Sequence, residues 1–210
     1  HMDRYQFHYT NAIKAGDTDV LRQYWRFTAP TVPDISRLVE GGHYAALLAA
    51  PIVVPKNEKA LCTIAAHHGY LNILRWAHAE GYAWDKGTCD SAACCGHLEV
   101  LQWLVARGCP IGANTCASAA YAARAGLEIL QWLRAQDPPC PWNTWTCSYA
   151  AGRGHFEVLQ WARANGCPWD ELTCVWAARG GHLAILQWAR ANGCPWNALV
   201  CTQAARYGHL

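Results

Sequence analysis

A Gly-His pair, or a close equivalent, recurs along the whole chain, and this repeat limits the possible folds more than any other feature. The marks fall at positions 16, 42, 69, 96, 125, 154, 181 and 208 of the 210-residue sequence. The intervals are 26, 27, 27, 29, 29, 27 and 27 residues, and the two longer steps contain two extra residues before Glu128 and before Cys140. Periods of about 20–50 residues are typical of stacked repeat architectures. We therefore expect seven units and the beginning of an eighth.

Each unit contains two helical stretches. In the string TCVWAARGGHLAILQWARANG, residues 173–193, an alanine-rich stretch ends in glycine, and a second stretch follows with Leu183, Ile185 and Trp188 at helical spacing. Gly193 is a typical stop signal. Helices this short are not stable alone, but stacked copies share a continuous core. We predict an all-α solenoid of antiparallel helix pairs, one array over 1–210, with divergent units over 3–58 and regular units over 59–210.

The same string resembles the ankyrin repeat, whose signature has an A-x-x-G-H motif followed by a leucine-rich second helix. Cys174 and Trp188 stand at leucine positions of that signature. The family unit has about 33 residues and this one has 27, and the difference falls after Gly193, where the family forms its β-hairpin finger. The resemblance implies an ankyrin-like helical solenoid with shortened turns instead of β-hairpin fingers. Short Cys- and Trp-rich repeats of this kind are similar to ankyrin families of giant DNA viruses and some protists.

Ten of the twelve cysteines occupy two repeated registers. One register opens the first helix of a unit and the other follows the second helix: Cys62, Cys89, Cys116, Cys147, Cys174 and Cys201, then Cys109, Cys140, Cys167 and Cys194. A zinc site takes about four ligands, usually with a closely spaced pair, and here neighbouring cysteines are seven residues apart. We predict buried, reduced thiols that bind no metal, with a Cys167–Cys174 disulfide left open. Cys94 and Cys95 lie outside both registers and are the best candidates for reactive thiols, although a structural role is the simpler interpretation.

Other repeated residues are interpreted as structural. The tryptophans recur at one position of the second helix and one position of the turn, which indicates packing, whereas Trp176 occurs once on a first helix and could contact a partner. The repeated histidines are expected to form hydrogen bonds at helix starts. Arg163 and Arg190 are expected at outward helix ends.

The sequence contains no catalytic constellation. It has neither a G-x-S-x-G elbow nor a glycine-rich phosphate loop, and its carboxylates are scattered. Cys95 beside Gly96-His97 resembles a thiol–imidazole pair, but His97 is a repeat position. We predict that the chain is not an enzyme and has no catalytic residue, no cofactor and no metal.

Function is expected at the positions that vary between units. The resemblance implies that the two residues after Ala-Ala line a concave face. A second variable position lies earlier on the same helix and is expected to be partly buried. These positions give the candidate partner-binding residues His67, His68, Tyr121, Arg124, Tyr149, Arg153, Trp176, Arg179, Gln203, Arg206 and Tyr207.

We predict a protein–protein interaction scaffold that binds an acidic or helical segment of a protein partner on this face. Two alternatives stay open. The arginines and aromatic residues could bind nucleic acid, which the formal charge of +2 disfavours. The array could also be the adaptor arm of a larger protein, with a module outside this chain for ubiquitin-ligase recruitment.

Composition predicts the cellular compartment and whether the chain contacts a membrane. The longest apolar run, residues 44–54, is interrupted by Pro51 and too short for a membrane span. Twelve cysteines without a secretory signal predict an intracellular protein, cytoplasmic or nuclear, in the host cell if the protein is viral. We expect a monomer with no membrane contact. We also expect Leu210 to be an artificial end, since it falls within a unit.

Overall fold

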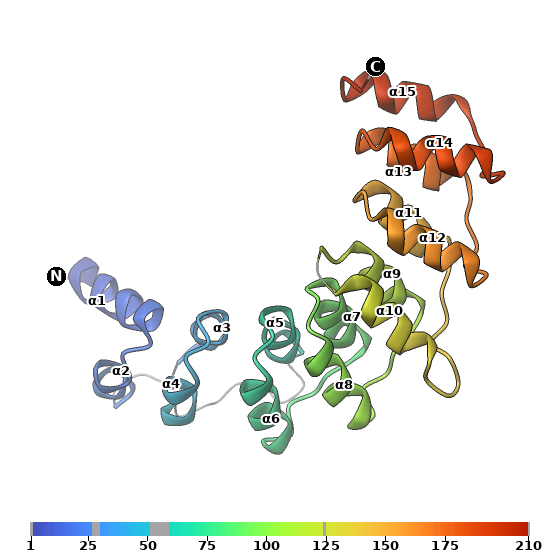
Figure 1. Ribbon diagram of the computed structural model, residues 1–210. Coiled ribbons are helices and arrows are strands. Elements are labelled where there is room, and N and C mark those ends of the chain that lie inside the picture. Colours follow the sequence, from blue (N-terminus) through green and yellow to red (C-terminus); the bar gives the residue numbers. More distant parts are fainter. Residues whose placement is uncertain (1, 27–29, 51–58, 124, 210) are drawn as a thin grey trace. The chain divides into compact units, whose positions relative to one another are not determined.

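The chain is an all-helical repeat array (Figure 1). The computed structural model describes residues 2–26, 30–50, 59–123 and 125–209, and these contain fifteen α-helices and no strand. The first helices of the pairs are α1 (Met2–Ala15), α3 (Val32–Glu40), α5 (Ala60–His68), α7 (Lys86–Cys94), α9 (Ala113–Tyr121), α11 (Thr144–Gly152), α13 (Glu171–Arg179) and α15 (Ala198–Arg206). The second helices are α2 (Thr18–Trp25), α4 (Tyr44–Ala49), α6 (Leu71–Ala79), α8 (Leu98–Ala106), α10 (Gly126–Arg134), α12 (Phe156–Ala164) and α14 (Leu183–Ala191). The predicted array of stacked helix pairs is confirmed.

Every repeat mark is a left-handed residue that follows a first helix, and the first seven lie between the two helices of a pair. Seven marks are glycines with φ between 64° and 79°, a region that glycine enters without steric cost. The eighth mark, Ala125, has φ 54° and is the only non-glycine residue with positive φ in the described ranges. The regular spacing of the marks therefore reflects a repeated sharp turn.

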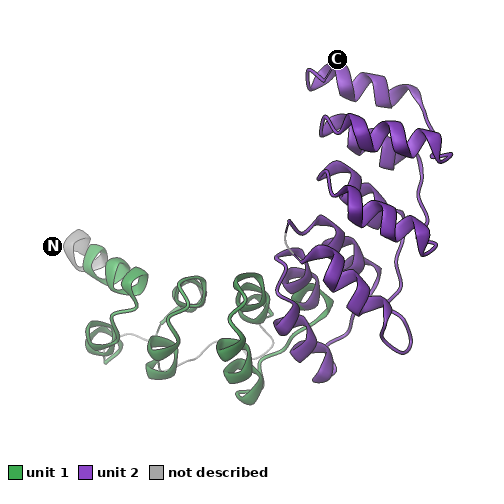
Figure 2. Cartoon of the chain, in the orientation of Figure 1, with its two compact units in different colours: residues 1–88 green, residues 89–210 purple. Residues whose placement is uncertain are grey.

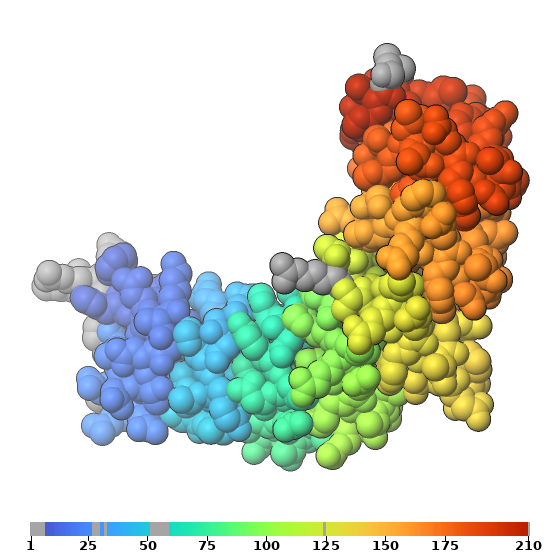
Figure 3. All heavy atoms as spheres, viewed as in Figure 1, coloured from blue at the N-terminus to red at the C-terminus, as the bar shows by residue number. Residues whose placement is uncertain are grey.

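The chain forms two compact parts, residues 1–88 and 89–210 (Figure 2). In the second part, the first helices α9, α11, α13 and α15 pack on one another in order, and each of α10, α12 and α14 packs on its own first helix. Space-filling atoms of successive pairs in this part form a continuous surface (Figure 3). The array thus has an inner layer of first helices and an outer layer of second helices.

The two layers contribute different side chains to the core. Second helices supply large apolar groups such as Leu101, Ile129, Leu130 and Leu133, all fully buried. In the 89–210 part the first helices supply mainly alanine and cysteine, whose small size lets neighbouring helices approach closely. Burial of these apolar groups stabilises each pair only through its neighbours.

The connections between pairs are short. Residues 165–170 link α12 to α13 and residues 192–197 link α14 to α15, with no strand in either segment. Asp170 caps α13 by accepting a hydrogen bond from the backbone N–H of Leu172 at 3.1 Å. Such capping satisfies an otherwise unpaired helix N–H group. The expectation of tight turns in place of hairpin fingers is confirmed for these segments.

Arginine and tryptophan stack at the outer ends of the second helices. The guanidinium carbon Cζ of Arg163 lies 4.0 Å from the ring centre of Trp169. The same guanidinium donates a hydrogen bond to the carbonyl oxygen of Cys167. Trp169 in turn packs edge-to-face on Trp188 of the next pair, with ring centres 5.8 Å apart. The Arg134–Trp142–Trp161 group repeats this arrangement one unit earlier. These tryptophans join consecutive units.

Two of the repeated histidines, His43 and His182, bond to the preceding unit, and not to their own helix as expected. Nε2 of His182 lies 3.2 Å from the carbonyl oxygen of Gly152, and Nε2 of His43 lies 3.0 Å from that of Lys14. His182 is the N-cap residue of α14, yet its side chain makes no capping hydrogen bond. The side chain instead satisfies a carbonyl near the end of the previous first helix, a group that the helix leaves unpaired.

The cysteine registers form thiol pairs within units. In 89–210 the first-helix thiol lies beside the turn thiol of the same unit: Cys89 with Cys109, Cys116 with Cys140, Cys147 with Cys167, and Cys174 with Cys194. All eight of these residues are buried free thiols. Cys167 and Cys174, the seven-residue neighbours, therefore belong to different pairs.

Cys201 is the exception to the predicted burial of the register cysteines. It is exposed, because no second helix packs on α15 within the described residues. The other nine register cysteines are buried.

Candidate binding surface on the first helices

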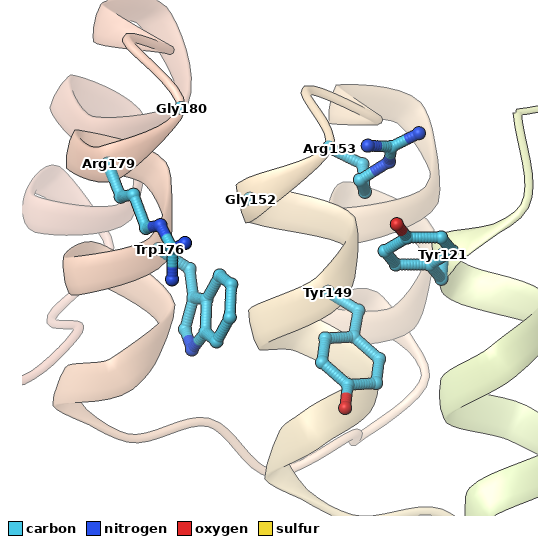
Figure 4. A pocket seen from close by; sticks show the side chains of 7 residues that line it. All are labelled: Tyr121, Tyr149, Gly152, Arg153, Trp176, Arg179 and Gly180. Carbon is cyan, nitrogen blue, oxygen red and sulfur yellow. The ribbon is translucent and has the colours of Figure 1, made fainter. Parts of the chain in front are cut away.

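A pocket opens on the first-helix layer where α9, α11 and α13 end (Figure 4). Its volume is about 270 Å³. The lining residues are Tyr121, Tyr149, Gly152, Arg153, Trp176, Arg179 and Gly180. Five of these were predicted as partner-binding residues from sequence variation between units.

The aromatic rings form a continuous row. Tyr149 lies between the other two rings, with centres 5.8 Å from Tyr121 and 6.2 Å from Trp176 (Figure 4). The interplanar angles are 77° and 89°, the edge-to-face geometry that aromatic pairs prefer. Tyr149 and Trp176 are half-buried, whereas the Tyr121 side chain is more exposed.

Arginines cover both ends of this row. The Arg153 guanidinium lies 4.4 Å from the ring centre of Tyr121. That of Arg179 lies 5.0 Å from the ring centre of Trp176 and 5.2 Å from that of Tyr207. These distances are within the range of cation–π attraction. We call these six residues the Arg–aromatic band: Tyr121, Tyr149, Arg153, Trp176, Arg179 and Tyr207.

The band carries unpaired positive charge. Arg153 and Arg179 are exposed, and neither forms an ion pair with a carboxylate in the described part of the chain. Helices α9, α11, α13 and α15 contain one acidic residue, Glu171, in the first turn of α13 and so at the opposite end from Arg179. The surface is therefore suited to an anionic partner group.

Two glycines create the space for the pocket. A Cβ atom on Gly152 would lie 3.1 Å from Cβ of Trp176, and one on Gly180 would lie 2.7 Å from the carbonyl oxygen of Gly152. Equivalent positions in other units hold residues such as Tyr121 and Arg206 for Gly152, and Tyr207 for Gly180. The sequence contains this signal, a glycine at a position that holds a large side chain in several other units, but the prediction considered only which side chains are present.

The remaining predicted residues lie elsewhere. His67 and His68 are exposed on α5, in the 1–88 part, where His68 stacks on Tyr70 with ring centres 5.5 Å apart. Gln203 and Arg206 lie on α15 and do not line the pocket. Arg124 falls outside the described residues. Trp145, which was not predicted, extends the row because its ring centre lies 5.5 Å from that of Tyr149.

Cys94 and Cys95 have the environment of structural thiols. Both are half-buried, and burial raises the pKa of each thiol above its usual value. A raised pKa lowers the fraction of nucleophilic thiolate at neutral pH. In the described ranges no group of three or more His, Cys, Asp or Glu side chains is arranged to hold a metal ion.

No protein-family model matches the chain, and no curated protein matches it. A similar solved structure is the crystal structure of the pentatricopeptide repeat protein PPR10 in complex with an 18-nt psaJ RNA element. The TM-score is 0.48 and the identity 18%, and the match covers 95% of this chain but only 36% of that chain.

None of the helices in the described residues is long and apolar enough to cross a membrane.

Proposed function

We propose that this chain is a binding scaffold that holds a protein partner on the first-helix face of residues 89–210, through the Arg–aromatic band. This face corresponds to the concave face of an ankyrin array. The partner supplies an acidic segment, extended or helical, that lies across successive units.

The observation that carries the proposal is the contrast between the two layers. On the outer layer, arginine and tryptophan recur at fixed positions and contact each other, as Arg163 and Trp169 do. On the inner layer, the arginines and rings differ between units and their charges have no carboxylate partner in the described ranges. Arginine and aromatic residues are also the residues that dominate binding energy at interfaces.

A second candidate is the binding of single-stranded nucleic acid. The exposed rings of Tyr121 and Tyr207 beside arginines favour it, because bases stack on such rings and arginines contact phosphates. The 89–210 part has eight arginines, no lysine and seven carboxylates, a formal charge of +1. We rank this candidate second because nucleic-acid grooves are generally strongly basic.

We propose that the units are a shortened, Cys- and Trp-rich form of the ankyrin repeat, similar to arrays of giant viruses. We further propose a monomer without catalytic activity that works in the cytoplasm or nucleus, either alone or as the adaptor arm of a larger protein.

The test compares proteins retained by immobilised wild-type chain with those retained by two variants. The band variant carries Arg153→Ala and Arg179→Ala, and the control carries Arg190→Ala, on the outer layer. A partner that the band variant retains at least tenfold less, while the control retains it fully, supports the proposal. Equal retention by all three proteins contradicts it. A bound nucleic acid whose affinity falls steeply with salt favours the second candidate.

A further inference from the structure

The pocket in the band is small and has mostly aromatic walls. At about 270 Å³ it lies below the ~300–1,000 Å³ typical of small-molecule sites. Its walls are the rings of Tyr121, Tyr149 and Trp176, and backbone at Gly152 and Gly180 completes it. This size and lining suit one planar apolar side chain.

The arginines at the pocket mouth are held in place before binding. Arg153 stacks on Tyr121 and Arg179 stacks on Trp176, so each guanidinium has less side-chain freedom to lose when a ligand binds. A guanidinium that lies over a ring still directs its N–H groups outward in its own plane. Those groups can pair with a carboxylate in a two-point contact.

Arg153 and Arg179 are placed to pair with two separate anionic groups. Arg153 directly follows α11 and Arg179 is the last residue of α13, and the two stack on different rings, with Tyr149 between those rings (Figure 4). Two carboxylates on either side of a central side chain match the arrangement without rearrangement.

We infer that the pocket anchors one aromatic side chain of a partner peptide, whose flanking acidic residues pair with Arg153 and Arg179. This inference rests on the proposed function, because it names the ligand of the same face. The pocket belongs to units five to seven, since Gly152 is the only glycine at its repeat position and the next unit supplies Gly180; Gly41, at the position of Gly180 in unit two, follows no such glycine. A peptide with this pattern should therefore bind once per chain.

The experiment measures fluorescence anisotropy of labelled seven-residue peptides with the full chain. The first peptide has a central Phe and three Asp or Glu residues on each side. The second replaces Phe by Ala, and the third keeps Phe but replaces the acidic residues by Ser. We expect the first peptide to bind with 1:1 stoichiometry and at least tenfold more tightly than either of the others.

Variants of the chain test which residues provide the preference for Phe and which provide the preference for acidic flanks. Trp176→Ala should abolish the preference for Phe over Ala, and Arg179→Ala should abolish the preference for acidic flanks, while Arg190→Ala changes neither. Because Trp176→Ala removes a half-buried ring, Tyr149→Leu provides a second pocket variant, and thermal melts verify that each protein folds. Loss of the Phe preference in either folded pocket variant supports the inference.

Failure of the aromatic anchor and failure of the proposed function give different results. Equal binding of the Phe and Ala peptides, with Arg179→Ala weakening both, overturns the anchor but leaves the first-helix face as a binding surface. Binding that Arg179→Ala does not change, or no binding of any acidic peptide, overturns the anchor and counts against the proposed function. Tighter binding of a single-stranded RNA 18-mer, with steep salt dependence, replaces the peptide by nucleic acid.

Discussion

The Sγ atom of Cys140 lies 3.4 Å from the carbonyl oxygen of Gly112, which precedes α9 at the other end of the same helix pair. Cys167 makes the same contact with the carbonyl of Asn143 at 3.6 Å, and Cys194 with that of Asp170 at 3.4 Å. Each thiol thus connects the end of a unit to its beginning. The turn cysteine therefore contributes a hydrogen bond in addition to apolar packing.

Replacing Cys167 by Ala should lower the free energy of unfolding by about 1–2 kcal/mol, because it removes a buried sulfur and its hydrogen bond. Urea denaturation measures this change. Cys201→Ala is the matched control on an exposed cysteine, and it should change stability by less than about 0.5 kcal/mol. Equal effects of the two substitutions would contradict the structural role of the buried thiol.

Arg163→Ala should lower the melting temperature by a few degrees. It removes a cation–π contact with Trp169 and a hydrogen bond to the Cys167 carbonyl, which together contribute about 1–2 kcal/mol. From sequence, Arg163 was expected only at an outward helix end. Arg206→Ala, on exposed α15, should leave the melting temperature unchanged, and a scanning fluorimetry series compares the two.

The sequence was sufficient for the layout of the scaffold. The spacing of the glycine marks located every turn between paired helices, and the alanine-rich and Leu-Gln-Trp stretches located the helices themselves. It was not sufficient for contacts between units, because periodicity places residues along a helix but does not say which neighbour they reach. The His182 bond to Gly152 and the Cys147–Cys167 pair are of that kind.

Stability should fall as pH drops below about 6.5, partly because of His155. Burial, followed by the nearby charges of Arg153 and His182, lowers its pKa from the usual 6.5, although the backbone at Tyr121 partly opposes this shift. Below 6.5 the unfolded chain gains a proton that the folded chain resists, so protonation favours unfolding. His155→Gln should reduce the decline in melting temperature between pH 7 and 5, whereas His209→Gln, at an exposed position, should not.

Ala117→Ser should stabilise the array. At three junctions a buried threonine meets a polar side chain of the preceding unit: Thr88 with Thr63, Thr115 with Asp90, and Thr173 with Ser148. Thr146 makes no such bond, because Ala117 stands at the matching position and only the weak thiol of Cys167 is near. A serine hydroxyl there should add about 0.5–1 kcal/mol in urea denaturation. A lower stability for this variant would contradict the proposed junction.

The candidate site was predicted in its residue types but not in its shape. Variation between units indicated Tyr149, Arg153, Trp176 and Arg179. The pocket itself depends on how closely α11 and α13 approach at Gly152, a distance that no single position encodes. The two glycines are a signal in the sequence, but the lining and size of the pocket follow only from the three-dimensional arrangement.

The near-identity of the strings at 154–169 and 181–196 has a consequence for how such a chain can evolve. Coding segments for these second helices are close to interchangeable, so unequal recombination within them would duplicate or delete whole units without disturbing the joins. An added copy of the α13 segment would carry Trp176, Arg179 and Gly180 together to a new place in the array. Binding specificity could then change by gain or loss of entire units, while each outer helix still met a neighbour of the same sequence.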